Sequence, residues 1–142
     1  MKINNTILVN YDNVLGYFGK KKLPQKISYA ITKDMIIISK ELEAYRTSLQ
    51  KIIDAYKDYQ VKNESGEIEN MPIGIPKVDK DHEVDYLSEV EDLLNIETDI
   101  ELYYIEEEVF DYQDSERYDA MSAHDILTLQ SVICKKDDEP TE

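Results

Sequence analysis

The side chains with the clearest capacity for chemistry are acidic, because seventeen Asp and Glu residues crowd positions 79–119. Asp79, Asp81, Glu83 and Asp85 stand at alternate positions, as the oxygen ligands of a calcium loop do. An EF-hand loop that began at residue 79 would need a glycine at position 84 and a glutamate at position 90, and valine occupies both. We therefore predict no metal site, and we expect these acids to favour the positive end of a helix dipole.

Nucleophilic catalysis has equally little support. Cys134 is the only cysteine, and a thiol nucleophile needs a base beside it, for which only His82 and His124 are candidates. Because Cys134 follows two aliphatic residues, we expect a buried, inert thiol. The four glycines are scattered and form no phosphate-binding loop. The prediction is a protein without catalytic residues or a cofactor, that is, not an enzyme.

Charge is divided unevenly along the chain. Residues 1–60 hold ten basic and six acidic residues, a net charge of +4, whereas residues 61–142 hold six basic and twenty-five acidic residues, a net charge of −19. The acidic half would repel phosphates, so we expect no direct binding to nucleic acid. The acid forms either a solvated face that keeps the protein soluble or a surface complementary to a basic partner, including one that normally holds nucleic acid.

Tyrosines accompany the acids after residue 96, among them Tyr103, Tyr104 and Tyr118. Tyrosine combines a large contact area with a polar tip and is frequent in protein interfaces. The alternative is that these rings cover the edge of the core while the acids face water. The predicted partner-binding residues are Glu106, Glu107, Glu108, Asp111, Tyr112, Asp114 and Glu116.

A second pattern, in residues 24–61, predicts one long amphipathic helix. Its apolar and aromatic positions follow alternating steps of four and three, which is a heptad seam: Ile31, Met35, Ile38, Leu42, Tyr45, Leu49, Ile52, Tyr56 and Tyr59. About 38 residues make a rod of roughly 57 Å, longer than a compact domain of this size, so the helix must project, bend or be covered by other helices. The residues predicted to mediate self-association, for example as a homodimer, are Ile38, Leu42, Tyr45, Leu49, Ile52 and Tyr56.

The remaining elements are shorter. The predicted segments are a helix over 13–18, a loop over 62–82, an acidic helix-strand-helix part over 83–136 with its strand at 100–105, and a disordered acidic tail over 137–142. The strand pairs with either 7–9 or 109–112, and Ser122 and Asp125 form a capping box for the final helix. We therefore predict one α+β, mainly α domain over 1–136, in which the heptad helix packs as a helical hairpin or bundle beside a small antiparallel sheet.

The order of these features resembles a group of small uncharacterised acidic proteins from phages of Gram-positive bacteria. The resemblance rests on the stretch from Lys22 to Lys33 (Lys-Leu-Pro-Gln-Lys-Ile-Ser-Tyr-Ala-Ile-Thr-Lys), the long charged helix, the loop around Gly66, and the stretch from Asp92 to Glu97 (Asp-Leu-Leu-Asn-Ile-Glu), and it covers roughly residues 1–133. It implies a phage or prophage origin, expression in the cytoplasm of the bacterial host, and no known enzyme activity. Residues 106–120 are longer and more acidic than the resemblance leads us to expect.

Two functions follow as hypotheses. In the first, the chain is a phage-encoded protein–protein interaction module that inhibits a bacterial defence protein, such as a CRISPR nuclease, by acidic mimicry of nucleic acid at a basic surface. In the alternative, it is a structural or assembly protein that oligomerises through the heptad helix. A weaker third option is a sponge for a cationic or nucleotide-derived small molecule. No run of about 18 apolar residues is present, so we expect no membrane span.

Overall fold

The computed structural model describes residues 1–112 and 116–135. In chain order the elements are β1 (Lys2–Asn4), α1 (Asn5–Phe18), α2 (Gln25–Ala55), the 3-10 helix η1 (Lys57–Tyr59), α3 (Lys80–Leu94), β2 (Glu97–Asp99), the 3-10 helix η2 (Glu107–Phe110) and α4 (Ala123–Ile133). The predicted fold class, α+β and mainly α with one long helix and a small antiparallel sheet, is confirmed.

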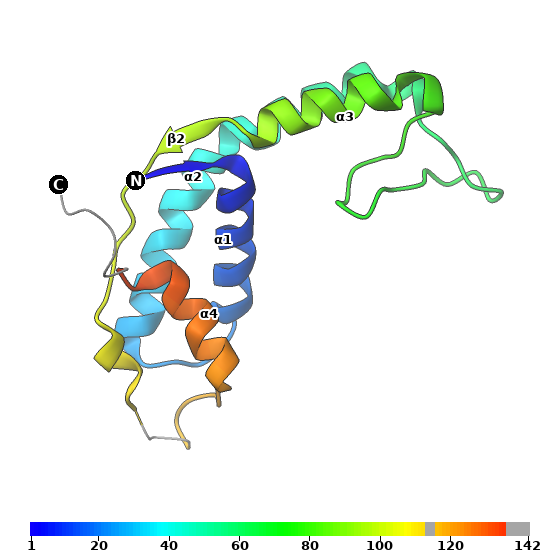
Figure 1. Ribbon diagram of the computed structural model, residues 1–142. Helices are drawn as coiled ribbons and strands as arrows, with labels where there is room; N and C mark the ends of the chain where they lie inside the picture. Colours follow the sequence, from blue (N-terminus) through cyan, green and yellow to red (C-terminus); the bar gives the residue numbers. More distant parts are fainter. Residues whose placement is uncertain (113–115, 136–142) are drawn as a thin grey trace.

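The long helix α2 links two parts of the molecule, which we call the body and the arm (Figure 1). In the body, α1 and α4 pack beside the first half of α2, around fully buried side chains such as Leu8, Leu15 and Leu129. In the arm, α3 runs back along the second half of α2, and residues 60–79 extend beyond its far end. The arm has its own small core, in which Tyr86 and Val90 of α3 pack against apolar residues of α2.

The predicted length of the heptad helix is too great at its far end. α2 stops at Ala55 rather than near residue 61, and η1 follows after Tyr56. The same seam is covered by two different partners, since its first half faces the body core and its second half faces the arm core. A helix of this length had to project, bend or be covered by other helices. The second half of α2 projects beyond the body, and other parts of the chain cover both halves of the seam.

Side-chain caps begin three of the helices. The Asn4 side chain accepts a hydrogen bond of 2.9 Å from the backbone N–H of Ile7, and this starts α1 eight residues earlier than the predicted helix at 13–18. Asp79 caps α3 in the same way, as expected of the acids there. Ser122 and Asp125 form the predicted capping box of α4, which is confirmed.

The predicted strand at 100–105 is wrong in position. β2 ends at Asp99 and pairs antiparallel with β1, with Lys2 opposite Asp99 and Asn4 opposite Glu97. Neither predicted partner segment is correct, because residues 7–9 belong to α1 and residues 109–112 lie at η2 and just after it.

The alternation that suggested the strand is nevertheless real. Ile100 and Leu102 are buried while Glu101 and Tyr103 are exposed, so the segment lies extended across the body. Its backbone contacts are isolated rather than those of a ladder: the N–H of Ile100 donates to the carbonyl of Met1, and Ile105 forms a single parallel bridge with Cys134.

The predicted loop over 62–82 is too long at its end, because α3 begins at Lys80, and the segment 60–79 contains an eight-residue structural repeat. Backbone pairs join Lys62 with Ile68 and, eight residues later, Asn70 with Pro76. Each turn holds a glycine with positive φ, Gly66 at 80° and Gly74 at 88°. The N–H of Val61 donates to the carbonyl of Lys77, the N–H of Lys77 to that of Glu69, and the N–H of Glu69 to that of Val61, each at 2.8–2.9 Å. These three hydrogen bonds join three short extended pieces into a closed ring.

Candidate partner-binding site

The predicted acidic site lies at the edge of the body. Glu106 is the N-cap residue of η2, and Glu107 and Glu108 form its first turn, with all three side chains exposed. They surround the buried Cys134 thiol, whose pKa rises to about 11, first through burial and then through the nearby negative charges. The prediction that Cys134 is buried is confirmed, and a raised pKa favours the neutral, less nucleophilic thiol.

The remaining predicted partner-binding residues divide into two groups. Asp111 and Glu116 are exposed, as a binding surface requires. Tyr112 is instead half-buried, packs against the body core and makes an edge-to-face contact with Tyr118, with ring centroids 5.5 Å apart. Tyr112 therefore mainly stabilises the body. Asp114 lies outside the described residues.

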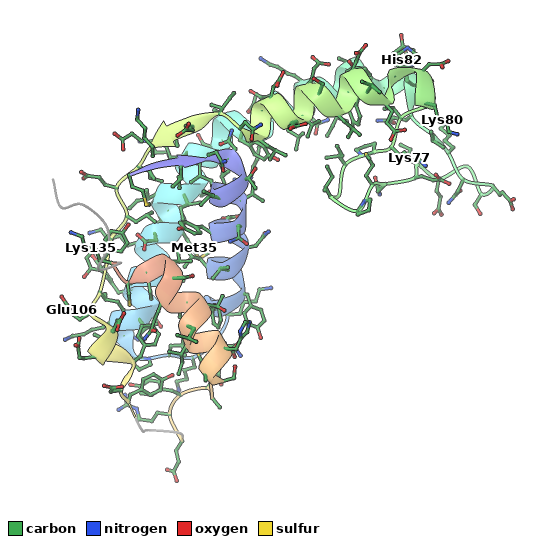
Figure 2. All side chains as sticks on the ribbon, viewed as in Figure 1. Met35, Lys77, Lys80, His82, Glu106 and Lys135 are labelled. Atoms are coloured by element: carbon green, nitrogen blue, oxygen red, sulfur yellow. The ribbon has the colours of Figure 1, made fainter. Side chains whose placement is uncertain are left out.

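Beside Glu106, the structure forms a groove that the sequence did not reveal. Its volume is about 500 Å³, and its walls come from the start of α2 and from the extended segment 103–109. The lining residues are Gln25, Lys26, Tyr29, Tyr103, Tyr104, Ile105, Glu106 and Val109. Figure 2 shows Glu106 on the body, well away from the end of the arm marked by His82.

Two tyrosines, one from each wall, meet in this groove, and a lysine lies over their rings. Tyr29 and Tyr103 meet edge to face, with centroids 5.6 Å apart. The Lys33 ammonium lies over both rings, 5.6 Å from the centroid of Tyr29 and 5.0 Å from that of Tyr103. These distances are those of cation–π contacts. The rings are thus held in place by α2 while their outer surfaces stay in contact with solvent.

A buried carboxylate holds the groove's second wall against α2. Asp34 is fully buried, and one of its oxygens accepts a hydrogen bond of 2.7 Å from the backbone N–H of Tyr103. Burial raises the pKa of Asp34 to about 6, although the Tyr103 hydrogen bond and the Lys33 charge act in the opposite direction.

A second acidic surface lies on the arm, where we had predicted only a well-charged helix start. α3 carries six carboxylates within its 15 residues: Asp81, Glu83, Asp85, Glu89, Glu91 and Asp92. All except the half-buried Glu83 are exposed. In the described residues, none of the six is within ion-pair distance of a lysine or arginine. Glu89 accepts a hydrogen bond from Tyr56, which raises the pKa of that tyrosine to about 12.

The spacing of these acids was visible in the sequence. Asp81, Asp85, Glu89 and Asp92 are separated by four, four and three residues, so they share one face of a helix. The groove, in contrast, joins residues about 75 positions apart, and no local pattern reveals such a site.

The residues predicted to mediate self-association are used within the chain. Ile38 and Leu42 have only 0% and 1% of their surfaces exposed, so the prediction is corrected for these two, which belong to the body core. Tyr45 is half-buried against the same core. The last three residues of the predicted set, Leu49, Ile52 and Tyr56, pack against the arm core. Association through the partly exposed residues stays a prediction.

Within residues 1–112 and 116–135, no group of three or more His, Cys, Asp or Glu side chains is arranged to hold a metal ion. His82 has one close carboxylate, Asp79, at 2.6 Å, and its ring stacks on Tyr59 with centroids 3.6 Å apart. In the same part of the chain, no helix has the combination of length and apolar character that crossing a bilayer requires.

Comparison with known proteins identifies no relative. The sequence matches no protein-family model, and searches of curated proteins and of solved structures give no significant match. The resemblance to small phage proteins therefore stays a prediction, and the function has to be argued from the surfaces described above.

Proposed function

We propose that this chain is a phage-encoded interaction protein that binds a basic surface of a bacterial defence protein in the host cytoplasm and inhibits it by occupying the place of nucleic acid. The observation that carries the proposal is the set of α3 carboxylates, which point to solvent without a basic partner among the described residues. Unpaired exposed charges of one sign favour a partner of the opposite sign and speed its approach.

The charge density of α3 supports mimicry of a nucleic-acid strand. Its 15 residues span roughly 22 Å at the α-helical rise. Six carboxylates over that length give about one negative charge every 4 Å, compared with about one phosphate per 3.4 Å of axis along one strand of DNA. A basic groove that neutralises phosphates would therefore meet a similar linear charge.

The shape of the molecule adds a second argument. The arm projects α3 away from the body, so that its outer face is available to a partner (Figure 1). Glu106, Glu107 and Glu108 form a separate acidic surface on the body. A partner with an extended basic channel could contact both surfaces, as it would contact successive phosphates.

Capture of a partner tests the proposal. The tagged chain is incubated with lysate of a Gram-positive host that carries an active defence system, and bound proteins are identified after washing at low salt. We expect a basic, nucleic-acid-binding protein that is released by raised salt and by added duplex DNA. A partner that stays bound in excess DNA would show that the chain does not occupy a nucleic-acid site.

Light scattering coupled to gel filtration separates this proposal from the assembly alternative. The body and arm cores bury much of the heptad seam within one chain, which favours a monomer or a small oligomer. A stable high-order oligomer at micromolar concentration would instead favour a role in phage assembly.

A further inference from the structure

The groove between α2 and residues 103–109 has the chemistry of a site for a guanidinium group. We propose that it binds an arginine side chain of the basic partner, with the guanidinium packed against the rings of Tyr29 and Tyr103 and bonded to the Glu106 carboxylate. This inference rests on the proposed function and deepens it, because it names the side chain that the partner contributes and the place that receives it.

The rings of the two groove tyrosines already attract a cation in the free protein, although Lys33 itself does not line the groove. Lys33 lies over the rings of Tyr29 and Tyr103 at 5.6 and 5.0 Å, so the two ring faces attract positive charge in the free protein. A lysine ammonium is strongly hydrated and exchanges readily with solvent, whereas a planar guanidinium stacks on aromatic rings and is less hydrated. A partner arginine can therefore displace the Lys33 ammonium from these rings.

Glu106 supplies the anion at the rim of the groove. Its carboxylate is exposed, and it forms no ion pair with the lysines or arginines in the described residues. A carboxylate can accept two parallel hydrogen bonds from one guanidinium, which fixes orientation as well as adding affinity. Glu107 and Glu108 add negative charge nearby, and this outweighs the single positive charge of Lys26 on the opposite wall.

The rest of the lining fits the aliphatic part of an arginine side chain. Ile105 and Val109 give the groove apolar surface beside the tyrosine rings. Arginine buries its methylene stem along such surface while its charged end stays near water. A volume of about 500 Å³ admits one long side chain together with a short stretch of its backbone.

Short peptides test the site without knowledge of the partner. The ¹⁵N-labelled full chain is titrated with acetyl-Gly-Gly-Arg-Gly-Gly-amide, and amide shifts are followed in ¹H–¹⁵N spectra. Matched peptides replace arginine with lysine or with citrulline, which is a neutral isostere of arginine. We expect saturable shifts around Tyr29, Tyr103 and Glu106 with the arginine peptide, several-fold weaker binding of the lysine peptide, and no saturation with the citrulline peptide.

Variants of the chain separate a specific site from a general attraction between opposite charges. Glu106→Gln and Tyr29→Leu should each weaken the arginine peptide by about three- to tenfold. Lys33→Ala should strengthen it by about two- to threefold, because the internal competitor is removed. The matched control is Tyr17, which is 57% exposed compared with 55% for Tyr29 and also has a lysine over its ring, Lys21 at 5.3 Å. Tyr17→Leu should leave binding unchanged.

Three results would overturn the inference. They are equal binding of the citrulline peptide, equal loss in the Tyr17→Leu and Tyr29→Leu variants, and shifts spread evenly over α3 and the body. The wider function is tested separately by partner capture. If a basic partner is captured and Glu106→Gln and Tyr29→Leu bind it as the parent does, the arginine site is wrong and the proposed function stands. If the peptide binds the groove and no basic partner is captured, the proposed function fails alone.

Discussion

The backbone N–H of Tyr103 donates a hydrogen bond of 2.7 Å to one oxygen of Asp34, and the second oxygen of that carboxylate is buried without a hydrogen-bond partner. An unpaired buried oxygen carries a desolvation cost that a proton on the carboxyl group relieves. This one residue therefore connects the wall of the groove, the packing of the body and the response of the protein to pH.

The first prediction concerns Asp34→Asn. The pKa of Asp34 is about 6 in the folded protein against 3.8 in the unfolded chain, so the folded state holds this proton more tightly. The contribution of Asp34 to stability is thus greatest below pH 3.8 and is lost as the pH rises through 6. The asparagine variant avoids this loss, so between pH 4.5 and 7.5 its stability relative to the parent should rise by about 2 kcal/mol.

Urea unfolding at the two pH values measures this difference. The control is Asp58→Asn, an exposed aspartate at η1, which should show little change in relative stability between the two pH values. If Asp34→Asn lowers the free energy of unfolding equally at both pH values, the ionised carboxylate is not the costly form and the prediction is wrong.

The second prediction compares two isoleucines of α2. Ile38 is fully buried in the body core, whereas Ile36 has 67% of its surface exposed. Ile38→Ala should reduce the free energy of unfolding by about 2–5 kcal/mol, and Ile36→Ala should change it by less than about 0.5 kcal/mol. Both are measured by urea unfolding at two protein concentrations. If the two variants lost equal stability, or if the urea midpoint of the parent chain rose with protein concentration, the exposed face of α2 that carries Ile36 would pack against another chain.

The third prediction concerns the glycines of the arm repeat. Gly74 has a φ of 88°, so Gly74→Ala should destabilise the repeat by about 1–2 kcal/mol, although nothing lies within 4 Å of the new methyl group. Gly16 lies inside α1, also with nothing within 4 Å, so Gly16→Ala should stabilise the protein by about 0.5–1 kcal/mol. Thermal unfolding measures the effect of Gly16→Ala. For Gly74→Ala, the measurement is hydrogen exchange of the backbone amides of residues 69 and 77, which should become faster. Unchanged exchange in Gly74→Ala would contradict the account of the repeat.

Local patterns in the sequence predicted what local interactions control. The heptad seam predicted α2, and the box of Ser122 and Asp125 predicted the start of α4. The acids around Asp79 indicated a charged helix start, although α3 begins at Lys80, three residues before the predicted position. Each of these features depends on residues within a few positions of one another. The end of α2 was misplaced because the tyrosine steps continue through Tyr56 and Tyr59 after the helix has ended.

Long-range pairing could not be predicted in the same way. Alternation predicted a strand at 100–105, whereas the strand that forms is Glu97–Asp99 and its partner is Lys2–Asn4. Within the predicted strand, Tyr103 bonds to the Asp34 side chain instead of to another strand. The groove also depends on long-range contacts, because Tyr29 and Tyr103 lie side by side only when the body is folded. The sequence does not reveal the eight-residue repeat at 61–78, because its two halves share the glycine position but few other side chains.

The fourth prediction tests the acidic arm. Asp85 and Asp92 are exposed on α3 and lie beyond its first turn, so replacing both with lysine reverses charge without disturbing the helix start. The control reverses two exposed acids on the body, Glu43 and Glu101, and gives the same net charge. A general electrostatic attraction would weaken equally in both variants, whereas a contact made by α3 would weaken only in the first.

The most direct test of the central claim is the affinity of these two variants for the captured basic partner, measured by calorimetry at two salt concentrations. We predict that Asp85→Lys with Asp92→Lys weakens binding at least about tenfold and reduces its salt dependence, while Glu43→Lys with Glu101→Lys changes affinity less than about threefold. Equal affinities of the α3 variant, the control variant and the parent chain would contradict the claim that the arm binds a basic surface.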